Sequence, residues 1–81
     1  MNIYVGNLDF KVDDNELKEI FEEYGSVSSA KVITDKFSGR SRGFGFIEME
    51  DDSEAQKAID ELNGSSINDR AIVVNQAKPR N

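Results

Sequence analysis

The sequence predicts an α+β fold in which strands and helices follow one another in the order β-α-β-β-α-β. Two segments place apolar residues at helical spacing, and four short segments around them are rich in β-branched and aromatic residues. A chain of 81 residues is expected to form a single domain, here residues 1–81. The order is the split β-α-β pattern, in which right-handed crossovers place both helices on one face of a four-stranded antiparallel sheet.

The first half of the chain contains a strand, a helix and a second strand. Residues 2–6 and 28–34 are rich in strand-forming residues. A helix is expected within residues 12–25, where apolar residues follow the i, i+3, i+4, i+7 spacing of one face. The residues on this face are Leu17, Ile20, Phe21 and Tyr24. Asp13, with a glutamate three residues later, resembles a capping box, and Gly25 is a natural helix stop.

The second half places a helix between two further strands. A polar, basic connection over residues 35–43 leads to a predicted strand over 44–50, a helix within 51–64 and a final strand over 71–77. The apolar face of this helix contains Ala55, Ala58, Ile59 and Leu62. An aspartate again marks the helix start, and a glycine marks its end. Residues 65–70 are expected to form a turn with at most a short extended piece.

Alternation along the strands separates a buried face from an open face. The strand residues expected under the helices are Ile3, Val5, Ala30, Val32, Gly45, Ile47, Met49, Ile72 and Val74. Among them, Gly45 lets a helix approach the backbone closely. The residues expected on the open face are Tyr4, Lys31, Ile33, Phe44, Phe46, Glu48, Val73 and Asn75. Three aromatic side chains are thus left without helices to cover them.

The composition excludes several classes of function. Cysteine and histidine are absent, so disulfides, thiolate metal sites, the commonest metal ligand and the usual general base near neutral pH are all missing. No apolar run is long enough to span a membrane, and the start does not resemble a signal peptide. An intracellular protein that has no membrane association and uses neither metal nor cofactor is therefore expected.

The charge is distributed unevenly along the chain. The net charge of −6 argues by itself against nucleic acid as a partner. However, residues 11–24 and 48–63, which contain the predicted helices, together hold 13 acids and 3 bases. The remaining residues hold 3 acids and 7 bases. The strands and loops therefore carry a positive excess that the total charge conceals.

Two segments resemble the signature motifs of a known family. "IYVGNL" at residues 3–8 and "RGFGFIEM" at residues 42–49 resemble the two ribonucleoprotein motifs of the RNA recognition motif family. The longer motif reads basic, Gly, aromatic, small, Phe, Val, any, aromatic. The sequence matches this pattern except at Ile47, a conservative change, and at Met49, which replaces an aromatic residue on the buried side. The likeness extends over essentially the whole chain and implies a ferredoxin-like fold.

The resemblance implies a role for each aromatic residue of the open face. Tyr4 is expected to stack on one base, Phe46 on the next, and Phe44 to pack against the sugars between them. Arg42 is expected to contact a phosphate. Residues near the end of the last strand are expected to contact base edges, namely Asn75, Gln76 and Lys78. Further phosphate contacts are expected from the rim of the sheet, namely Lys31, Arg40 and Arg80.

The function implied by the resemblance is binding of single-stranded RNA without catalysis. Single-stranded DNA is a second expected ligand, because stacking does not require the 2′-hydroxyl. The chain is similar to compact single-domain members from bacteria and to the RNA-binding domain of glycine-rich plant members. A monomer acting in post-transcriptional regulation is expected, located in the cytoplasm, or in the nucleus of a eukaryote.

Three alternatives compete with this interpretation. The same fold serves as a protein-interaction module, for which the acidic helix faces would attract basic peptides. The exposed phenylalanines could instead form the core of an oligomer of sheets packed face to face, although Arg42 and Lys31 would then be buried. An enzyme on this fold, such as a small phosphatase, is a third alternative, but the sequence shows no nucleophile-base pair.

Overall fold

The computed structural model describes residues 1–77, except for the side chain of Ser41. The elements, in chain order, are β1 (Asn2–Gly6), α1 (Asp14–Glu22), β2 (Ser29–Thr34), β3 (Ser41–Glu48), α2 (Asp52–Leu62), β4 (Ser66–Ile67), β5 (Arg70–Ala71) and β6 (Val73–Gln76). With the small hairpin β4–β5 set aside, this is the predicted order β-α-β-β-α-β.

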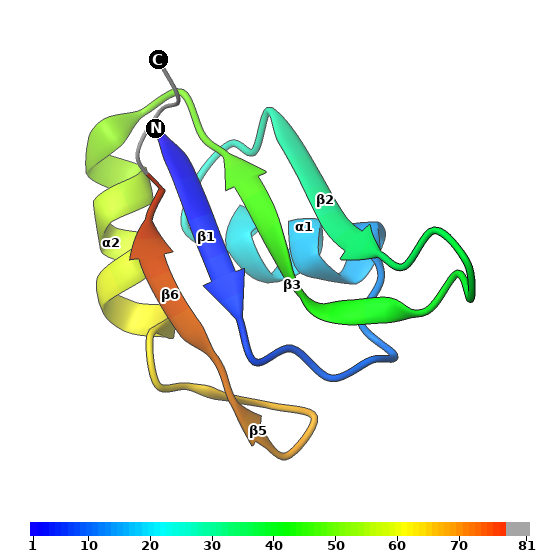
Figure 1. The fold of residues 1–81 in the computed structure, drawn as a ribbon. Helices are drawn as coiled ribbons and strands as arrows, with labels where there is room; N and C mark the ends of the chain where they lie inside the picture. Colours follow the sequence, from blue (N-terminus) through cyan, green and yellow to red (C-terminus); the bar gives the residue numbers. More distant parts are fainter. Residues whose placement is uncertain (78–81) are drawn as a thin grey trace.

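The main sheet has four antiparallel strands in the spatial order β2-β3-β1-β6. The strands that carry the two signature motifs, β1 and β3, are therefore neighbours at its centre. Both helices lie behind the sheet in Figure 1, which looks onto the uncovered face. This arrangement confirms the predicted fold class.

The hydrophobic core lies between the sheet and the helices. Its fully buried large side chains are Phe21, Ile3, Leu8, Leu17, Ile47, Met49, Ile72, Val5 and Val74. Ile20 and Ala30, which were predicted to belong to this core, pack at its margin and are only partly buried. Leu8 and Val12 are buried although they lie between β1 and α1, where neither a strand nor a helix pattern singled them out. The core is thus larger than predicted.

Gly45 brings α1 close to the sheet, as expected. A Cβ atom at this position would lie 2.5 Å from the carbonyl oxygen of Lys31 and 3.1 Å from Cδ2 of Leu17. Both neighbours belong to packed elements, so there is no space for a side chain here.

The helix starts are capped as predicted, but one helix end differs. Each helix is capped by an aspartate whose side chain accepts a hydrogen bond from a backbone N–H three residues later. Asp13 accepts from Glu16 at 2.8 Å, and Asp51 accepts from Glu54 at 3.0 Å. Gly64 follows α2 with a φ of +84°, typical of a glycine helix stop. The prediction for Gly25 was wrong: α1 ends earlier, and the positive φ angles do not include this glycine. Gly25 instead leaves space for the side chain of Glu54.

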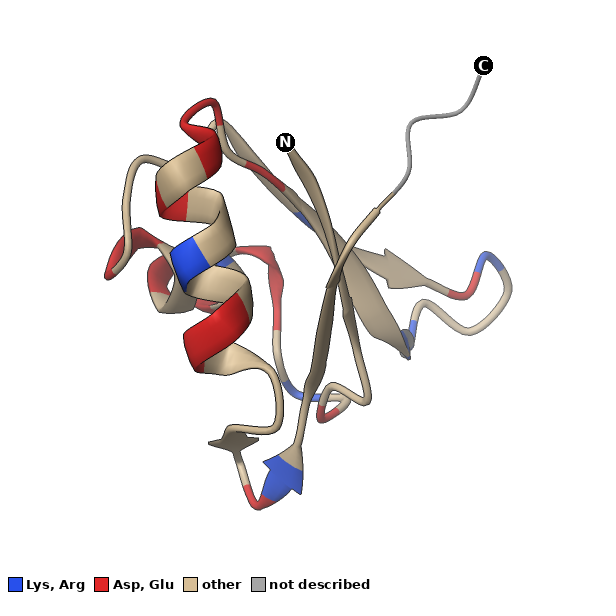
Figure 2. Ribbon diagram, turned by 90° about the vertical axis from the view of Figure 1, so that its left-hand side faces the viewer, with Lys and Arg blue, Asp and Glu red and all other residues tan. Residues whose placement is uncertain are grey.

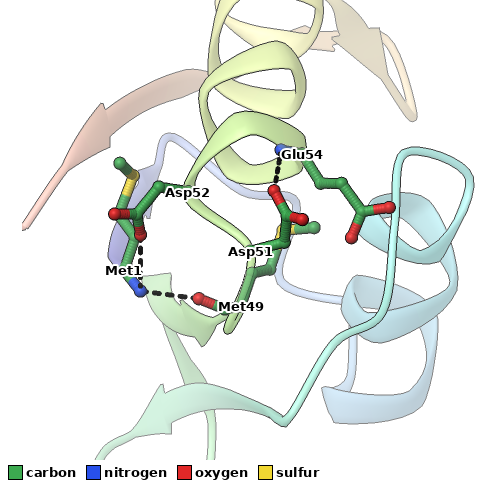
Figure 3. A network of polar contacts seen from close by, with 5 residues as sticks. All are labelled: Met1, Met49, Asp51, Asp52 and Glu54. Atoms are coloured by element: carbon green, nitrogen blue, oxygen red, sulfur yellow. Dashed lines mark hydrogen bonds and ion pairs between the residues drawn. The ribbon is translucent and has the colours of Figure 1, made fainter.

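Polar contacts of the amino terminus connect β1 to the start of α2 (Figure 3). The amino group of Met1 donates a hydrogen bond of 2.6 Å to the carbonyl oxygen of Met49. It also lies 3.6 Å from a carboxylate oxygen of the exposed Asp52. Met49 follows β3, so these contacts hold the ends of the two central strands together beside the helix.

The first residues of β3 and β6 differ from the predicted strand starts. β3 begins at Ser41, three residues before the predicted start. Its pairing with β2 is irregular, because Val32 opposes Gly45 whereas Thr34 opposes Ser41. Gly43 lies inside this irregularity with a φ of +81°, a conformation that favours glycine. The predicted last strand is divided into β5 and β6, and β5 pairs with β4 in a hairpin at residues 66–71.

Replacing Gly45 by alanine should destabilise the protein by about 1–3 kcal/mol, the usual cost of overpacking a core. The added methyl group meets the Lys31 carbonyl and Leu17 and cannot be accommodated without moving one of them. Urea unfolding measures the effect, with Ser29→Ala on the exposed side of β2 as a control expected within about 0.5 kcal/mol of the parent. Equal midpoints for both variants would contradict the packing described for α1.

Candidate nucleic-acid interface

Three aromatic side chains meet on the open face because β1 and β3 pair in a fixed register. Tyr4 lies opposite Phe46, and Gly6 lies opposite Phe44. The neighbours of these residues along the strands, Ile3, Val5, Gly45 and Ile47, are buried against the helices. Since side chains alternate along a strand, all three aromatic residues point to the uncovered face.

The rings contact one another and remain accessible. The ring centroids lie 5.8 Å apart for Tyr4 and Phe46, 6.1 Å for Tyr4 and Phe44, and 6.2 Å for the two phenylalanines. These separations are typical of aromatic pairs. Phe46 is 41% exposed, and the other two are half-buried. Together the rings form a continuous aromatic platform, to which no part of α1 or α2 provides a cover.

Gly6 determines how the ring of Tyr4 lies on the sheet. A Cβ atom at Gly6 would be 2.7 Å from the Tyr4 hydroxyl and 3.0 Å from two ring carbons. The ring therefore extends across the glycine toward the Phe44 end of the platform. Sequence reasoning did not identify Gly6 as part of the site, although its position two residues after Tyr4, on the same side of the strand, is the signal that could have done so.

A row of side chains crosses all four strands through this platform. In register order the row contains Lys31 on β2, Phe46 on β3, Tyr4 on β1 and Asn75 on β6. Lys31 and Asn75 are exposed, so a cation and an amide flank the two rings. We call these four residues the central row. The structure thus brings together four of the predicted site residues in one line.

The remaining predicted site residues are placed less uniformly. Arg42 is exposed near the start of β3, and Arg40 is exposed in the preceding loop. Gln76 lies opposite Ile3, a residue of the buried face, so its side chain is on the helix side of the sheet and away from the aromatic platform. Lys78 and Arg80 lie outside the described residues.

Two residues that sequence reasoning did not assign to the site, Phe10 and Arg70, lie near the end of β1 and the start of β3. Phe10, between β1 and α1, is 65% exposed. The guanidinium of Arg70 lies over its ring at 5.8 Å from the centroid. Arg70 reaches this position through the β4–β5 hairpin, which was predicted only as a turn. The contact joins segments 60 residues apart, so no local pattern signals it.

Charge separates the two layers of the molecule. Figure 2 shows most acidic residues on the helix layer, whereas the strands of the sheet are mainly uncharged. On the open face, Glu48 lies two residues beyond Phe46, at the end of β3 that is opposite Arg42. An anionic ligand is therefore favoured at the Arg42 end of the platform and disfavoured at the Glu48 end and on the helices.

Asp35 organises the loop between β2 and β3. Its carboxylate accepts hydrogen bonds from the backbone N–H groups of Phe37 at 2.7 Å and Ser38 at 3.2 Å. These two bonds lower the pKa of Asp35 below its ordinary value of 3.8, and the bond from Phe37 has the largest effect. The nearby positive charge of Arg42 lowers the pKa further. The loop that carries Arg40 is therefore a hydrogen-bonded turn.

Among residues 1–77 there is no group of three or more acidic, cysteine or histidine side chains that could hold a metal ion. None of the helices in this part of the chain has the length and apolar character needed to cross a membrane.

Comparison with known families identifies the class of protein that this fold and surface define. The sequence model of the family described as RNA recognition motif matches residues 3–73. This range includes both helices, β3 and all of β1 except Asn2. The chain therefore belongs to the RNA recognition motif family, a class of RNA-binding domains, as its motifs predicted.

The relatives with similar sequences include proteins of cyanobacteria and of chloroplasts. The protein named "Putative RNA-binding protein RbpA" of Synechocystis is 49% identical over 80 residues, which cover 99% of this chain and 79% of that protein. The chloroplastic 28 kDa ribonucleoprotein of Spinacia oleracea is 47% identical over 78 residues. This match covers 96% of the chain but only 34% of the spinach protein, so the chain spans about a third of that relative.

Solved structures agree with this assignment. The crystal structure of RNA-binding protein PG1 superimposes with a TM-score of 0.95 at 49% identity and covers 100% of this chain and 98% of that chain. The structure of the Sxl-lethal protein in complex with RNA superimposes with a TM-score of 0.88 at 36% identity. It covers 94% of this chain and 47% of that chain.

A titration of the Asp35 carboxyl by NMR should have its midpoint below 3.8, because the turn stabilises the ionised form. The turn is stabilised at pH values above the ordinary pKa, and this contribution is lost as the pH falls through the lower pKa of the folded state. The amide signals of Phe37 and Ser38 should shift with the same midpoint. A midpoint at or above 3.8 would contradict the described hydrogen bonds.

Proposed function

We propose that the chain binds single-stranded RNA across the central row. Tyr4 and Phe46 stack on successive bases, and Phe44 packs against the sugars between them. Arg42 contacts a phosphate at the loop end of β3, and Lys31 adds a charge beside Phe46. The observation that carries this proposal is the group of three mutually contacting rings on the uncovered sheet face, flanked by Lys31 and Asn75.

Physical chemistry favours a flexible strand of bases as the ligand. Each base has a π-face, and stacking on an aromatic side chain contributes about 1–3 kcal/mol by alanine substitution. Neighbouring strands lie about 4.8 Å apart, so rings on β1 and β3 can serve adjacent nucleotides. Base stacking in a duplex hides the faces that the rings need, whereas the unstacked bases of single-stranded RNA can be splayed outward. Single-stranded DNA is a second ligand on the same grounds.

The charge distribution supports an oriented and salt-dependent complex. Phosphates near Arg42 and Lys31 release counterions on binding, so the affinity falls as salt rises. The acidic helix layer repels the RNA backbone and keeps nonspecific binding low. We propose a monomer that acts by binding, without catalysis, in post-transcriptional regulation.

The location and the competing protein-interaction role stay predictions. The sequence predicted a cytoplasmic protein, and the names of the spinach relative and others add the chloroplast as a compartment in which similar domains occur. Binding of basic peptides by the acidic helices is the alternative function. The exposed rings favour RNA, because that alternative leaves their exposure unexplained.

Replacing Phe44 and Phe46 together by alanine should weaken binding to short single-stranded RNAs by at least about tenfold, since one stacked base alone is worth about 1–3 kcal/mol. Fluorescence anisotropy with RNAs selected from a random pool measures the affinity, and far-UV circular dichroism checks the fold. A matched control is Val73→Ala, which removes an aliphatic side chain that is 43% exposed on the same face.

The control variant should bind RNA nearly as well as the parent. Unchanged affinity in the double phenylalanine variant would refute RNA binding by the aromatic platform. If Glu19→Gln and Glu22→Gln on α1 abolished a protein interaction while RNA binding was absent, the protein-interaction role would replace it.

A further inference from the structure

The main sheet has two edge strands, β2 on one side and β6 on the other (Figure 1). The outer side of an edge strand carries backbone N–H and C=O groups that no neighbouring strand of the sheet can bond. These groups are a template for pairing with an extended segment of another molecule, and folded proteins commonly cover or interrupt them. The two edges of this sheet differ in how their outward groups are occupied.

The β6 edge is covered by the segment that follows α2. The backbone N–H of Gly64 donates a hydrogen bond of 2.8 Å to the Ile72 carbonyl, and the N–H of Ile72 donates one of 2.9 Å to the Ser65 carbonyl. Further along, the N–H of Val74 donates to Oδ1 of Asn63 at 3.1 Å. Another molecule cannot add a strand to this edge without displacing these hydrogen bonds.

The β2 edge is guarded differently, by a side chain of α1. The backbone N–H of Val32, in the middle of β2, donates a hydrogen bond of 2.6 Å to Oδ1 of Asp14, the first residue of α1. Because this N–H bonds a helix residue and not β3, it lies on the outer side of the strand. The carboxylate of Asp14 therefore occupies the place at which the carbonyl of an added strand would accept the same hydrogen bond.

The start of α1 holds Asp14 in this position. Oδ1 of Asp13, the N-cap, accepts a hydrogen bond of 2.8 Å from the backbone N–H of Glu16, and the Asp13 carbonyl accepts one of 3.0 Å from Leu17. An acidic residue in the first turn is also favoured by the helix dipole. The acceptor for Val32 is thus part of a capped helix start and is fixed by it.

Without this acceptor, β2 has the properties of a pairing strand. Its sequence, SAKVIT, contains three β-branched residues, no glycine or proline, and one charged residue, Lys31. A hollow of about 480 Å³ beside the edge is lined by Val12, Asp14, Val32 and Thr34, among others, so the space next to Val32 is open to a second strand. Antiparallel pairing of a strand with its own copy is self-complementary and closes as a two-fold symmetric dimer.

We infer that the outer edge of β2 is an interaction surface for a second copy of this chain, and that Asp14 keeps this surface masked. With the Asp14 acceptor in place, the Val32 N–H is satisfied within one molecule and the domain stays a monomer. Without it, β2 pairs antiparallel with β2 of another copy, and the two sheets become continuous with their open faces on the same side. The inference goes beyond the proposed RNA binding and uses no ring of the aromatic platform.

The test removes the Asp14 acceptor in two ways and retains it in a third. Asp14→Ala deletes the acceptor. Asp14→Pro also deletes it but keeps a residue favoured at the first helical position, and the extended backbone of Asp13, with φ −105° and ψ −179°, suits a following proline. Sedimentation velocity over a range of protein concentrations should show dimers of both variants, with association constants about 10- to 100-fold above that of the parent. Asp14→Asn retains an Oδ1 acceptor and should behave like the parent.

A second measurement locates the contact. In a sample that mixes isotope-labelled and unlabelled Asp14→Pro protein, NOEs between molecules should connect residues 30–33 of one copy with the same residues of another. Asp13→Ala is the matched control, because it removes a carboxylate and the cap hydrogen bond from the same helix start but leaves Asp14 present. It should lower the melting temperature without promoting association.

Each outcome decides for or against the masked edge. Far-UV circular dichroism checks the fold, and Asp14→Pro decides the matter if Asp14→Ala does not fold. Monomeric behaviour of the folded Asp14 variants that lack the acceptor would overturn the inference. Equal association of Asp13→Ala would also overturn it, because general destabilisation would then explain the dimers. Equal association of Asp14→Asn, or NOEs between molecules that fall outside β2, would overturn it as well.

Discussion

The pairing of β1 with β3 is the constraint on which the rest of the structure depends. This pairing puts Tyr4 opposite Phe46 and Gly6 opposite Phe44, and it places Ile3 and Ile47 together on the other side. A shift of one residue would turn the aromatic residues toward the helices and the aliphatic ones toward water. The buried face makes that shift costly, so the core that stabilises the fold also holds the platform in position. The hydrophobic core and the proposed binding site therefore lie on opposite faces of the same two strands.

The helix layer and the open face of the sheet differ in their charge. A chain with a net charge of −6 is an unusual candidate for binding a polyanion, but its acidic residues are concentrated on the helices. The open face carries its rings in the middle, Glu48 toward one end and Arg42 toward the other. This polarity favours the phosphates of the proposed RNA strand at the Arg42 end of the platform. Charge distribution, and not total charge, is the relevant quantity for this domain.

Local patterns were sufficient to predict the fold class and the aromatic platform, because strand alternation and helical spacing are properties of neighbouring residues. The family was predicted from the resemblance of two short motifs to its signature. The features that were missed depend on contacts between distant segments. Leu8 and Val12 are buried in a connection that has no periodicity. Arg70 approaches Phe10 only because the β4–β5 hairpin folds against the loop after β1. The prediction that Gln76 contacts base edges came from its position near a strand end, and only the register with β1 reveals that its side chain lies on the helix side.

The most direct test of this account is a map of NMR chemical-shift changes when a short single-stranded RNA is added to the folded protein. The account predicts the largest changes at the central row, Lys31, Phe46, Tyr4 and Asn75, and at Phe44. Only small changes are predicted on the outer faces of α1 and α2. If the largest changes fell on the acidic helix faces while the aromatic signals stayed in place, the proposed interface would be wrong.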